Sequence, residues 1–312
     1  MARSSTRTRW HNVPTVLAEF VNRSGWSPVA LLNRIDRWTP GLNRARQLAD
    51  GLRYGPDERH RLDVWAPPER RQADVEATLR PVVVFFYGGG WHSGERADYG
   101  FAAAAFASEE FVVVVPDYRL VPTTRYPGFI EDGAAALRWV VKNIAAFGGD
   151  PARIVLSGHS AGAYIAAMLA LDERWLKAAG VDRAIIRASV LLSGPYDFAP
   201  FRERRGRIAF GDWPDPAATQ PVSHARRDIA PMLLVHGSGD RIVFAKNSRT
   251  LAARLAEAGA PVALRIFPGA NHADPVVALS RPFRGRLPVL AEAVAFLRDA
   301  LAAPTSAGKT GS

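Results

Sequence analysis

Short apolar runs alternate with helical segments from about residue 60 to the end of the chain. The apolar runs lie at residues 62–65, 82–86, 112–115, 154–157, 189–192, 232–236 and 262–267. Segments in which apolar residues recur at helical spacing lie at residues 101–107, 130–147, 161–171, 246–258 and 288–301. Runs that are apolar throughout are typical of strands buried on both faces of a parallel sheet. The alternation predicts an α/β protein with a mostly parallel central sheet and helices on both of its faces.

The segments outside this alternation predict the domain organisation. Residues 1–55 carry two short helical patterns, and we expect an N-terminal helical extension that either caps a pocket or packs on the main domain. Residues 56–303 form the main domain. A stretch at about 196–228, rich in Pro, Gly, Trp and Arg, is too long for an ordinary loop and predicts a small lid. Residues 304–312 are small and polar, and we expect a disordered tail.

Composition excludes several classes of protein. Apolar residues make up 48% of the 312-residue chain and charged residues 22%, so disorder is excluded as the main state. The chain has no cysteine, which excludes a disulfide scaffold, a thiolate zinc site and a cysteine nucleophile. We expect neither a metal site nor a cofactor.

The chain is basic, with a net charge of +10 and arginine clusters at residues 202–207 and 281–286. Such charge attracts phosphates, acidic lipids or anionic substrates. No zinc-finger, RRM-like or helix-turn-helix pattern accompanies it, so we interpret the arginines as solvated surface and expect no nucleic-acid partner. A nucleic-acid binder is the alternative, and it would show a steep salt dependence of binding.

No segment is suited to cross a membrane, because every apolar run is far shorter than the roughly 18 residues of a spanning helix. Polar residues also interrupt the basic N-terminus where a signal peptide would have its apolar core. We therefore expect no stable membrane insertion and a cytoplasmic location. The sequence leaves a homodimer open.

The motif that carries chemistry is Gly158-His159-Ser160-Ala161-Gly162. A buried strand runs into this motif and a helix of small residues runs out of it, which is the context of a nucleophile elbow. The glycines leave room for a serine in a strained turn, and the helix N-terminus favours a developing negative charge. The sequence predicts Ser160 as a nucleophile, and a glycine-rich turn with a passive serine is the alternative.

A serine nucleophile needs a base, and the base needs an orienting acid. In an elbow fold these follow in the order serine, acid, histidine, in loops after later strands. Asp240 and His272 each follow an apolar run, and His272 is the one histidine after Asp240. Both therefore belong to the sheet edge where a ligand crevice forms. We predict Asp240 as the acid, with Asp197 and Asp274 as alternatives, and His272 as the base.

A glycine run follows the buried segment 82–86, where residues 87–91 read Tyr-Gly-Gly-Gly-Trp. Glycines let the backbone approach a ligand and turn its N–H groups inward. We predict that the N–H groups of Gly88 and Gly89, with that of Ala161, form an oxyanion hole. A phosphate-cradling loop is the alternative, but no Gly-Lys-Ser/Thr follows and the spacing does not match Gly-x-Gly-x-x-Gly.

These motifs occur in one order together with Asp117-Tyr118-Arg119-Leu120, Gly149-Asp150-Pro151 and Gly269-x-x-His272. Over about residues 55–300, the order resembles that of the α/β-hydrolase esterases. The most similar branch is the hormone-sensitive-lipase-like, feruloyl-esterase and kynurenine-formamidase-like group. The resemblance implies an α/β-hydrolase fold with the triad Ser160, Asp240 and His272 and the oxyanion donors Gly88, Gly89 and Ala161.

The resemblance also bears on residues that support the site. It implies that Asp117 and Arg119 are structural and tie a strand end to neighbouring loops. The family usually has His-Gly-Gly where this chain has Tyr87 and two glycines. We expect the tyrosine hydroxyl to replace the hydrogen bond of that histidine.

The sequence therefore predicts a cofactor-free serine hydrolase, a carboxylesterase that cleaves a small-molecule ester through an acyl-enzyme. An amide or formamide hydrolase of the kynurenine-formamidase type is the alternative within enzymes, because it uses the same triad. A non-catalytic, ligand-binding homologue is the alternative outside enzymes. It predicts a lost triad residue, whereas all three residues are present.

Overall fold

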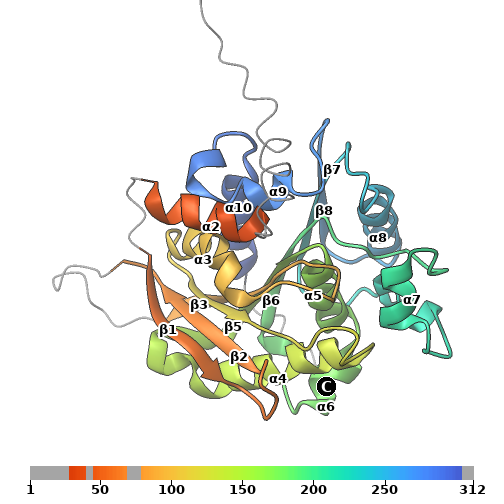
Figure 1. The fold of residues 1–312 in the computed structure, drawn as a ribbon, viewed down its shortest axis with the longest axis horizontal. Helices are drawn as coiled ribbons and strands as arrows, with labels where there is room; N and C mark the ends of the chain where they lie inside the picture. Colours follow the sequence, from red (N-terminus) through yellow and green to blue (C-terminus); the bar gives the residue numbers. More distant parts are fainter. Residues whose placement is uncertain (1–27, 40–44, 69–78, 304–312) are drawn as a thin grey trace, which may run out of the picture.

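The computed structural model describes residues 28–39, 45–68 and 79–303. Within these ranges, eight strands form one sheet in the order β1-β2-β4-β3-β5-β6-β7-β8 (Figure 1). β2 is antiparallel to its neighbours β1 and β4, and all other neighbouring pairs are parallel. The strands are β1 (Arg46–Arg53), β2 (Arg61–Ala66), β3 (Arg80–Phe86), β4 (Val112–Pro116), β5 (Gly149–His159), β6 (Ile186–Leu192), β7 (Met232–Gly237) and β8 (Val262–Phe267). The mostly parallel sheet is confirmed.

Helices cover both faces of this sheet. α3 and α10 pack against each other on one face, and α4 and α5 pack against each other on the other (Figure 1). The helices are α2 (Pro28–Trp38), α3 (Gly100–Ala107), α4 (Gly128–Asn143), α5 (Ala161–Leu171), α6 (Glu173–Ala178), α7 (Arg204–Phe210), α8 (Lys246–Glu257), α9 (Asp274–Val277) and α10 (Val289–Ala302). Short 3-10 turns are η2 (Arg96–Tyr99), η3 (Ile144–Phe147), η4 (Arg183–Ile185), η5 (Ala217–Thr219), η6 (Pro221–His224) and η7 (Arg281–Phe283).

The strand order reverses at β3, and this reversal positions the site. From β3 the chain passes through α3 to β4 on one side, and then returns through α4 to β5 on the other side of β3. In open α/β sheets, ligands bind at such a reversal, outside the carboxyl ends of the strands. Phe86 of β3 pairs with Gly158 of β5, so the two strands end at the same level. The glycine run after β3 and the serine motif after β5 therefore leave the sheet side by side.

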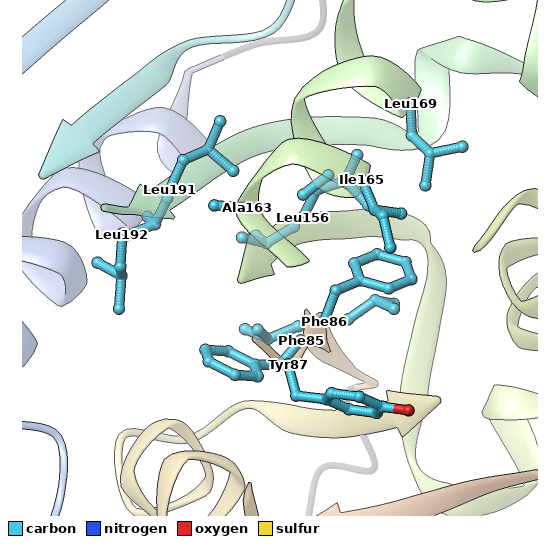
Figure 2. Close-up of a cluster of buried hydrophobic side chains, with 14 of the residues drawn as sticks. Phe85, Phe86, Tyr87, Leu156, Ala163, Ile165, Leu169, Leu191 and Leu192 are labelled. Atoms are coloured by element: carbon cyan, nitrogen blue, oxygen red, sulfur yellow. The ribbon is translucent and has the colours of Figure 1, made fainter. Parts of the chain in front are cut away.

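One part of the core lies between the middle strands and α5. Figure 2 shows Phe86, Leu156, Ile165 and Leu169 in this layer, and all four are buried. Burial of such side chains stabilises the fold by about 1.5–3 kcal/mol each. α5 is apolar on all sides because it is enclosed on all sides, with ten of its eleven residues buried. The segment that carries the serine motif is therefore rigidly held.

β1 is a strand that the apolar pattern does not predict. It lies within residues 1–55, which we expect to be helical, and it pairs with β2 through an irregular register. Most of its residues are exposed or half-buried, because it is an edge strand with little core to cover. The helix expected near residues 31–38 is confirmed by α2, whereas the one at 13–21 lies outside the described residues.

The roles of the other predicted segments stay predictions. The Asn33 side chain ties α2 to η2 and α3. It donates to the Ala97 carbonyl of η2 at 2.6 Å and accepts the Phe101 N–H of α3 at 2.9 Å. The stretch 196–228 contains α7, η5 and η6, on the side of the molecule that also carries α8 (Figure 1). The tail at 304–312 lies outside the described residues.

Candidate active site

Ser160 occupies a sharp turn between β5 and α5. Its backbone has φ +53° and ψ −119°, a region that non-glycine residues rarely adopt. A Cβ on Gly158 would lie 2.7 Å from the Phe86 carbonyl oxygen, and one on Gly162 only 2.0 Å from it. Only glycines fit at these two positions, because the turn presses directly against the backbone of β3. The context predicted for an elbow is thus present.

His272 and Asp240 reach this serine from two neighbouring loops. The Ser160 hydroxyl donates to His272 Nε2 at 2.9 Å, and His272 Nδ1 donates to Asp240 Oδ2 at 2.7 Å. Asp240 follows β7, and His272 follows β8, at the carboxyl ends of paired strands. The structure therefore brings together the three residues that the sequence singles out as nucleophile, base and acid.

Neither of the other candidate acids contacts His272 within the described residues. The Asp274 carboxylate accepts the Asn271 N–H at 2.7 Å. The N–H of Asp197 donates to Asn247 at 2.8 Å, and among the described residues its carboxylate makes no hydrogen bond to His272. The geometry favours Asp240.

The environment of Asp240 keeps it ionised. Its other oxygen, Oδ1, accepts the N–H groups of Ile242 and Val243, both at 2.9 Å. Burial by itself raises the pKa of Asp240, but hydrogen bonds from His236 and His272 outweigh burial and hold this pKa below its ordinary value. The carboxylate therefore carries its negative charge at neutral pH.

His236 is a contact of the acid that the sequence interpretation misses. It is fully buried, and its Nε2 donates to Asp240 Oδ2 at 3.1 Å and to the Val243 carbonyl at 2.8 Å. Its Nδ1 accepts from the Ser248 hydroxyl at 2.7 Å. His236 thus shares the Oδ2 atom of Asp240 with His272 and helps to fix the carboxylate. The four-residue spacing to Asp240 at a strand end is the signal that points to it.

His159 supports the base from the elbow itself. Its Nε2 donates to the His272 carbonyl at 3.0 Å. Burial first, and then the charge of His272, lower the pKa of His159 to about 3, so this ring is neutral at physiological pH. Its Nδ1 is buried, has no hydrogen-bond partner within the described ranges, and faces Gly88. His159 therefore positions the His272 loop.

The glycine run after β3 lies against the elbow. A Cβ on Gly88 would stand 3.3 Å from the Ser160 Cβ, so this loop borders the nucleophile directly. However, the Gly88 N–H donates to the Tyr99 hydroxyl at 3.2 Å. In the described part of the chain, the N–H groups of Gly89 and Gly90 meet no acceptor. The bond to Tyr99 turns the Gly88 donor away from the role that the sequence predicts for it.

Tyr87 supports the loop from outside the site. Its hydroxyl accepts from Arg59 at 2.8 Å, and Arg59 also donates to the Gly94 carbonyl at 2.9 Å. The Tyr118 hydroxyl donates to the Tyr87 carbonyl at 2.9 Å. Figure 2 shows the Tyr87 hydroxyl directed away from Leu191 and Ala163. The tyrosine hydroxyl therefore supports the glycine run indirectly, because the Arg59 side chain that donates to it also donates to the Gly94 carbonyl.

Asp117 and Arg119 join the end of β4 to its surroundings. Asp117 accepts from the Arg96 backbone at 2.8 Å and from its guanidinium at 2.7 Å. Arg119 pairs with the buried Asp132 at 2.7 Å, which also accepts from His60 at 2.9 Å. These contacts are those of structural residues, as the resemblance implies.

Aromatic side chains link the segment 196–228 to the glycine run. Trp91, at the end of the run, lies with its ring centroid 4.9 Å from that of Phe210 and 5.9 Å from that of Phe198. The Tyr164 hydroxyl of α5 donates to the Thr219 carbonyl at 2.7 Å. The predicted lid is thus packed against both the glycine run and the elbow helix.

Two further properties concern the residues that the structure describes. In these residues no helix has both the length and the apolar character that a membrane crossing requires. The same part of the chain holds no cluster of three or more His, Asp or Glu side chains arranged to bind a metal ion.

Comparison with known proteins identifies the family. The BD-FAE family model matches residues 62–255. The chain belongs to the BD-FAE family. Within the range that matches, this family member carries the glycine run, the serine motif and Asp240.

Relatives and solved structures agree with this assignment. The isoprenylcysteine alpha-carbonyl methylesterase ICME of Arabidopsis thaliana is 31% identical over 77% of this chain and 60% of its own length. Esterase LipC of Mycobacterium tuberculosis is 31% identical over 70% of this chain and 58% of its own. This BD-FAE chain therefore spans about 60% of the length of these curated relatives.

A thermophilic esterase from Thermogutta terrifontis, solved with propionate bound, superposes with a TM-score of 0.67 at 29% identity. The superposition covers 80% of this chain and 94% of that chain. These findings confirm the predicted α/β-hydrolase fold and the resemblance to α/β-hydrolase esterases.

Proposed function

We propose that this BD-FAE protein is a carboxylesterase that hydrolyses small-molecule carboxylic esters through an acyl-enzyme. The observation that carries the proposal is the continuous hydrogen-bonded chain from Ser160 through His272 to Asp240, with distances of 2.9 and 2.7 Å. The esterase names of the relatives support ester cleavage by that site.

In the proposed reaction, Ser160 Oγ attacks the ester carbonyl carbon while His272 Nε2 takes the hydroxyl proton. Asp240 accepts the Nδ1–H of His272, holds the ring in place and stabilises the imidazolium. The tetrahedral intermediate then expels the alcohol, which receives the proton from His272. Water, deprotonated by His272, attacks the acyl-enzyme and releases the carboxylic acid and free Ser160.

The oxyanion of each tetrahedral intermediate needs N–H donors near Ser160. We propose Gly89 and Ala161 for this role. Ala161 is the first residue of α5, so its backbone N–H has no hydrogen-bond partner within the helix and can donate to the oxyanion. The bond from Gly88 to Tyr99 favours Gly90 in place of Gly88 as the third donor.

Substitution of the nucleophile tests the proposal. Ser160→Ala is expected to lower kcat on p-nitrophenyl butyrate by about 10³-fold or more, because the reaction loses its covalent step. A fluorophosphonate should phosphonylate Ser160 with loss of fluoride, and the mass of the phosphonyl group should appear on Ser160 in the wild type and not in the variant. Full activity in Ser160→Ala would refute the proposal.

Substitution of the acid tests the arrangement of the triad. Asp240→Asn preserves shape but no longer stabilises the correct His272 tautomer, so kcat is expected to fall by about 10⁴-fold. Asp197→Asn is the matched control and should change kcat by less than about tenfold. The reverse order of effects would assign the acid role to Asp197.

Four further predictions concern the whole chain. A homodimer is tested by size-exclusion chromatography with light scattering, and a cytoplasmic location by cell fractionation.

Deletion of residues 1–27 tests the cap, and removal of the segment around α7 tests the lid. Either deletion should change KM across a series of acyl chain lengths if the segment covers the site.

A further inference from the structure

Arg205 extends over the glycine run from the predicted lid. Its helix, α7, turns Gly206, Ala209 and Phe210 into the protein and leaves Arg205 on the exposed side. The Arg205 side chain reaches back to the site: its Cδ and Nη1 each lie 3.6 Å from the place that a Cβ on Gly90 would take. The guanidinium therefore stands over the loop that borders Ser160.

Packed contacts hold α7 in this position. The ring centroid of Phe210 lies 4.9 Å from that of Trp91, which belongs to the glycine run, and 5.4 Å from that of Phe201. The Ala209 carbonyl accepts the Tyr126 N–H at 2.8 Å. Arg205 is thus carried by an element that is anchored to the loop it overlies.

The charge of Arg205 meets no counterion in the part of the protein that the structure describes. Within the described ranges, no carboxylate forms an ion pair with Arg205, whereas Arg96 pairs with three carboxylates, those of Asp50, Asp63 and Asp117. Burial first, and then the Arg205 charge, lower the pKa of the neighbouring His92. At neutral pH, Arg205 is therefore the cation at this part of the loop.

We propose that Arg205 binds a carboxylate carried by the substrate, so that the preferred substrates are anionic carboxylic esters. The proposal rests on the proposed esterase function of Ser160. A guanidinium matches a carboxylate with two parallel hydrogen bonds, and Arg205 lies over Gly90 in the same loop whose Gly88 borders Ser160. One arginine of the run at 202–207, interpreted above as solvated surface, is thereby assigned to the site.

Pairs of isosteric esters isolate the effect of the charge. Monomethyl glutarate carries the carboxylate on the acyl side, and methyl glutaramate replaces that carboxylate with a neutral amide of the same shape. Butyryloxyacetate and butyryloxyacetamide form the corresponding pair with the charge on the alcohol side. Chromatography of released methanol, glycolate or glycolamide gives kcat/KM for each ester.

Substitutions then assign the preference to one residue. The wild type is expected to favour the anionic member of one pair by about tenfold or more, and Arg205→Ala should abolish this ratio. Arg205→Glu should invert it. Arg204→Ala is the matched control, since Arg204 is exposed on the same helix and is not among the atoms nearest to Gly90; it should keep the ratio.

The outcomes separate this proposal from the one on which it rests. A wild type that favours neither anionic ester, or an Arg205→Ala variant that keeps the full preference, would overturn the carboxylate site. A preference that disappears in Arg204→Ala but not in Arg205→Ala would overturn it too. Lack of Ser160-dependent hydrolysis of neutral p-nitrophenyl butyrate would instead refute the esterase function, and the carboxylate site with it.

Discussion

Two glycine-rich turns meet at the candidate active site, and they need glycine for different reasons. In the elbow, a Cβ on Gly162 would lie 2.0 Å from the Phe86 carbonyl oxygen, which belongs to a different strand. In the glycine run, a Cβ on Gly89 would lie 2.0 Å from the Ser93 carbonyl oxygen, four residues along the same loop, and Gly89 has φ +134°. The elbow glycines let two core elements approach each other, whereas Gly89 lets one loop fold on itself.

The difference predicts two kinds of failure. A change in the elbow forces the core strands apart and should act on folding. A change in the glycine run is absorbed by the loop and should act on the direction of its N–H groups, and so on the chemistry.

Gly162→Ala is expected to have the largest effect. Because the added Cβ would overlap backbone atoms, the free energy of unfolding should fall by more than about 4 kcal/mol, or no folded protein should form. Thermal unfolding followed by circular dichroism measures this loss. Gly285→Ala is the control, since a Cβ there meets nothing within 4 Å. Melting of Gly162→Ala within a few degrees of the wild type would contradict the argument.

Gly89→Ala should damage catalysis more than folding. Displacing one oxyanion donor is expected to lower kcat by about 10²–10³-fold. Strain in the loop should cost only about 1–3 kcal/mol of unfolding free energy. Gly148→Ala imposes a positive-φ penalty, at φ +78°, with open space around it, and should leave kcat unchanged. Unchanged kcat in Gly89→Ala would remove Gly89 from the oxyanion hole.

Tyr99→Phe tests which N–H groups of the run serve the oxyanion. The variant leaves the buried Gly88 N–H without an acceptor, which should cost about 1–3 kcal/mol of unfolding free energy. We expect kcat to fall less than in Gly89→Ala. Tyr118→Phe is the control, because it removes a neighbouring hydroxyl but keeps the bond of Gly88. A rise in kcat of Tyr99→Phe would indicate that the freed Gly88 N–H reaches the oxyanion.

His159→Gln should change the pH dependence of stability. The pKa of His159 is about 3 in the folded protein and near its ordinary 6.5 in the unfolded chain. Between these values the unfolded chain binds a proton that the folded protein does not bind. The contribution of the neutral His159 ring to the free energy of unfolding is therefore fully present above pH 6.5. It is lost as pH falls toward 3, by up to about 1.4 kcal/mol per pH unit.

Urea denaturation at pH 7, 5.5 and about 4.5 measures this slope. The His159→Gln variant should lose less stability on acidification than the wild type, while glutamine can still donate to the His272 carbonyl. His224→Gln controls for the loss of a histidine elsewhere in the protein. Equal slopes in the wild type and in His159→Gln would show that His159 is not the group responsible.

Elements enclosed by the core were predictable from the sequence. α5 has the predicted bounds of residues 161–171. β4, with five buried residues, differs from its prediction by one residue. Burial on both faces demands an apolar run of the length of the element, so the pattern and the structure coincide. β1 was not predictable in this way, because an edge strand needs no such run.

The contacts between distant loops were not predictable to the same degree. The four-residue spacing from His236 to Asp240 places the two residues near each other, but it does not show that the His236 ring shares the Asp240 carboxylate with His272. Likewise, residues 87–91 alone do not show which N–H faces Tyr99. These contacts depend on the direction of single groups, and that direction is set by partners far away in the chain.

The sequence by itself determined the parallel part of the sheet, the elbow at Ser160 and the order in which Asp240 and His272 follow it. Local sterics and burial impose these features, so they are legible in short stretches of residues. Only the tertiary structure decided that Gly88 bonds to Tyr99, that His236 supports the acid, and that Arg205 lies over the glycine run. Each of these joins groups from separate elements, and their contact follows from how the whole chain packs.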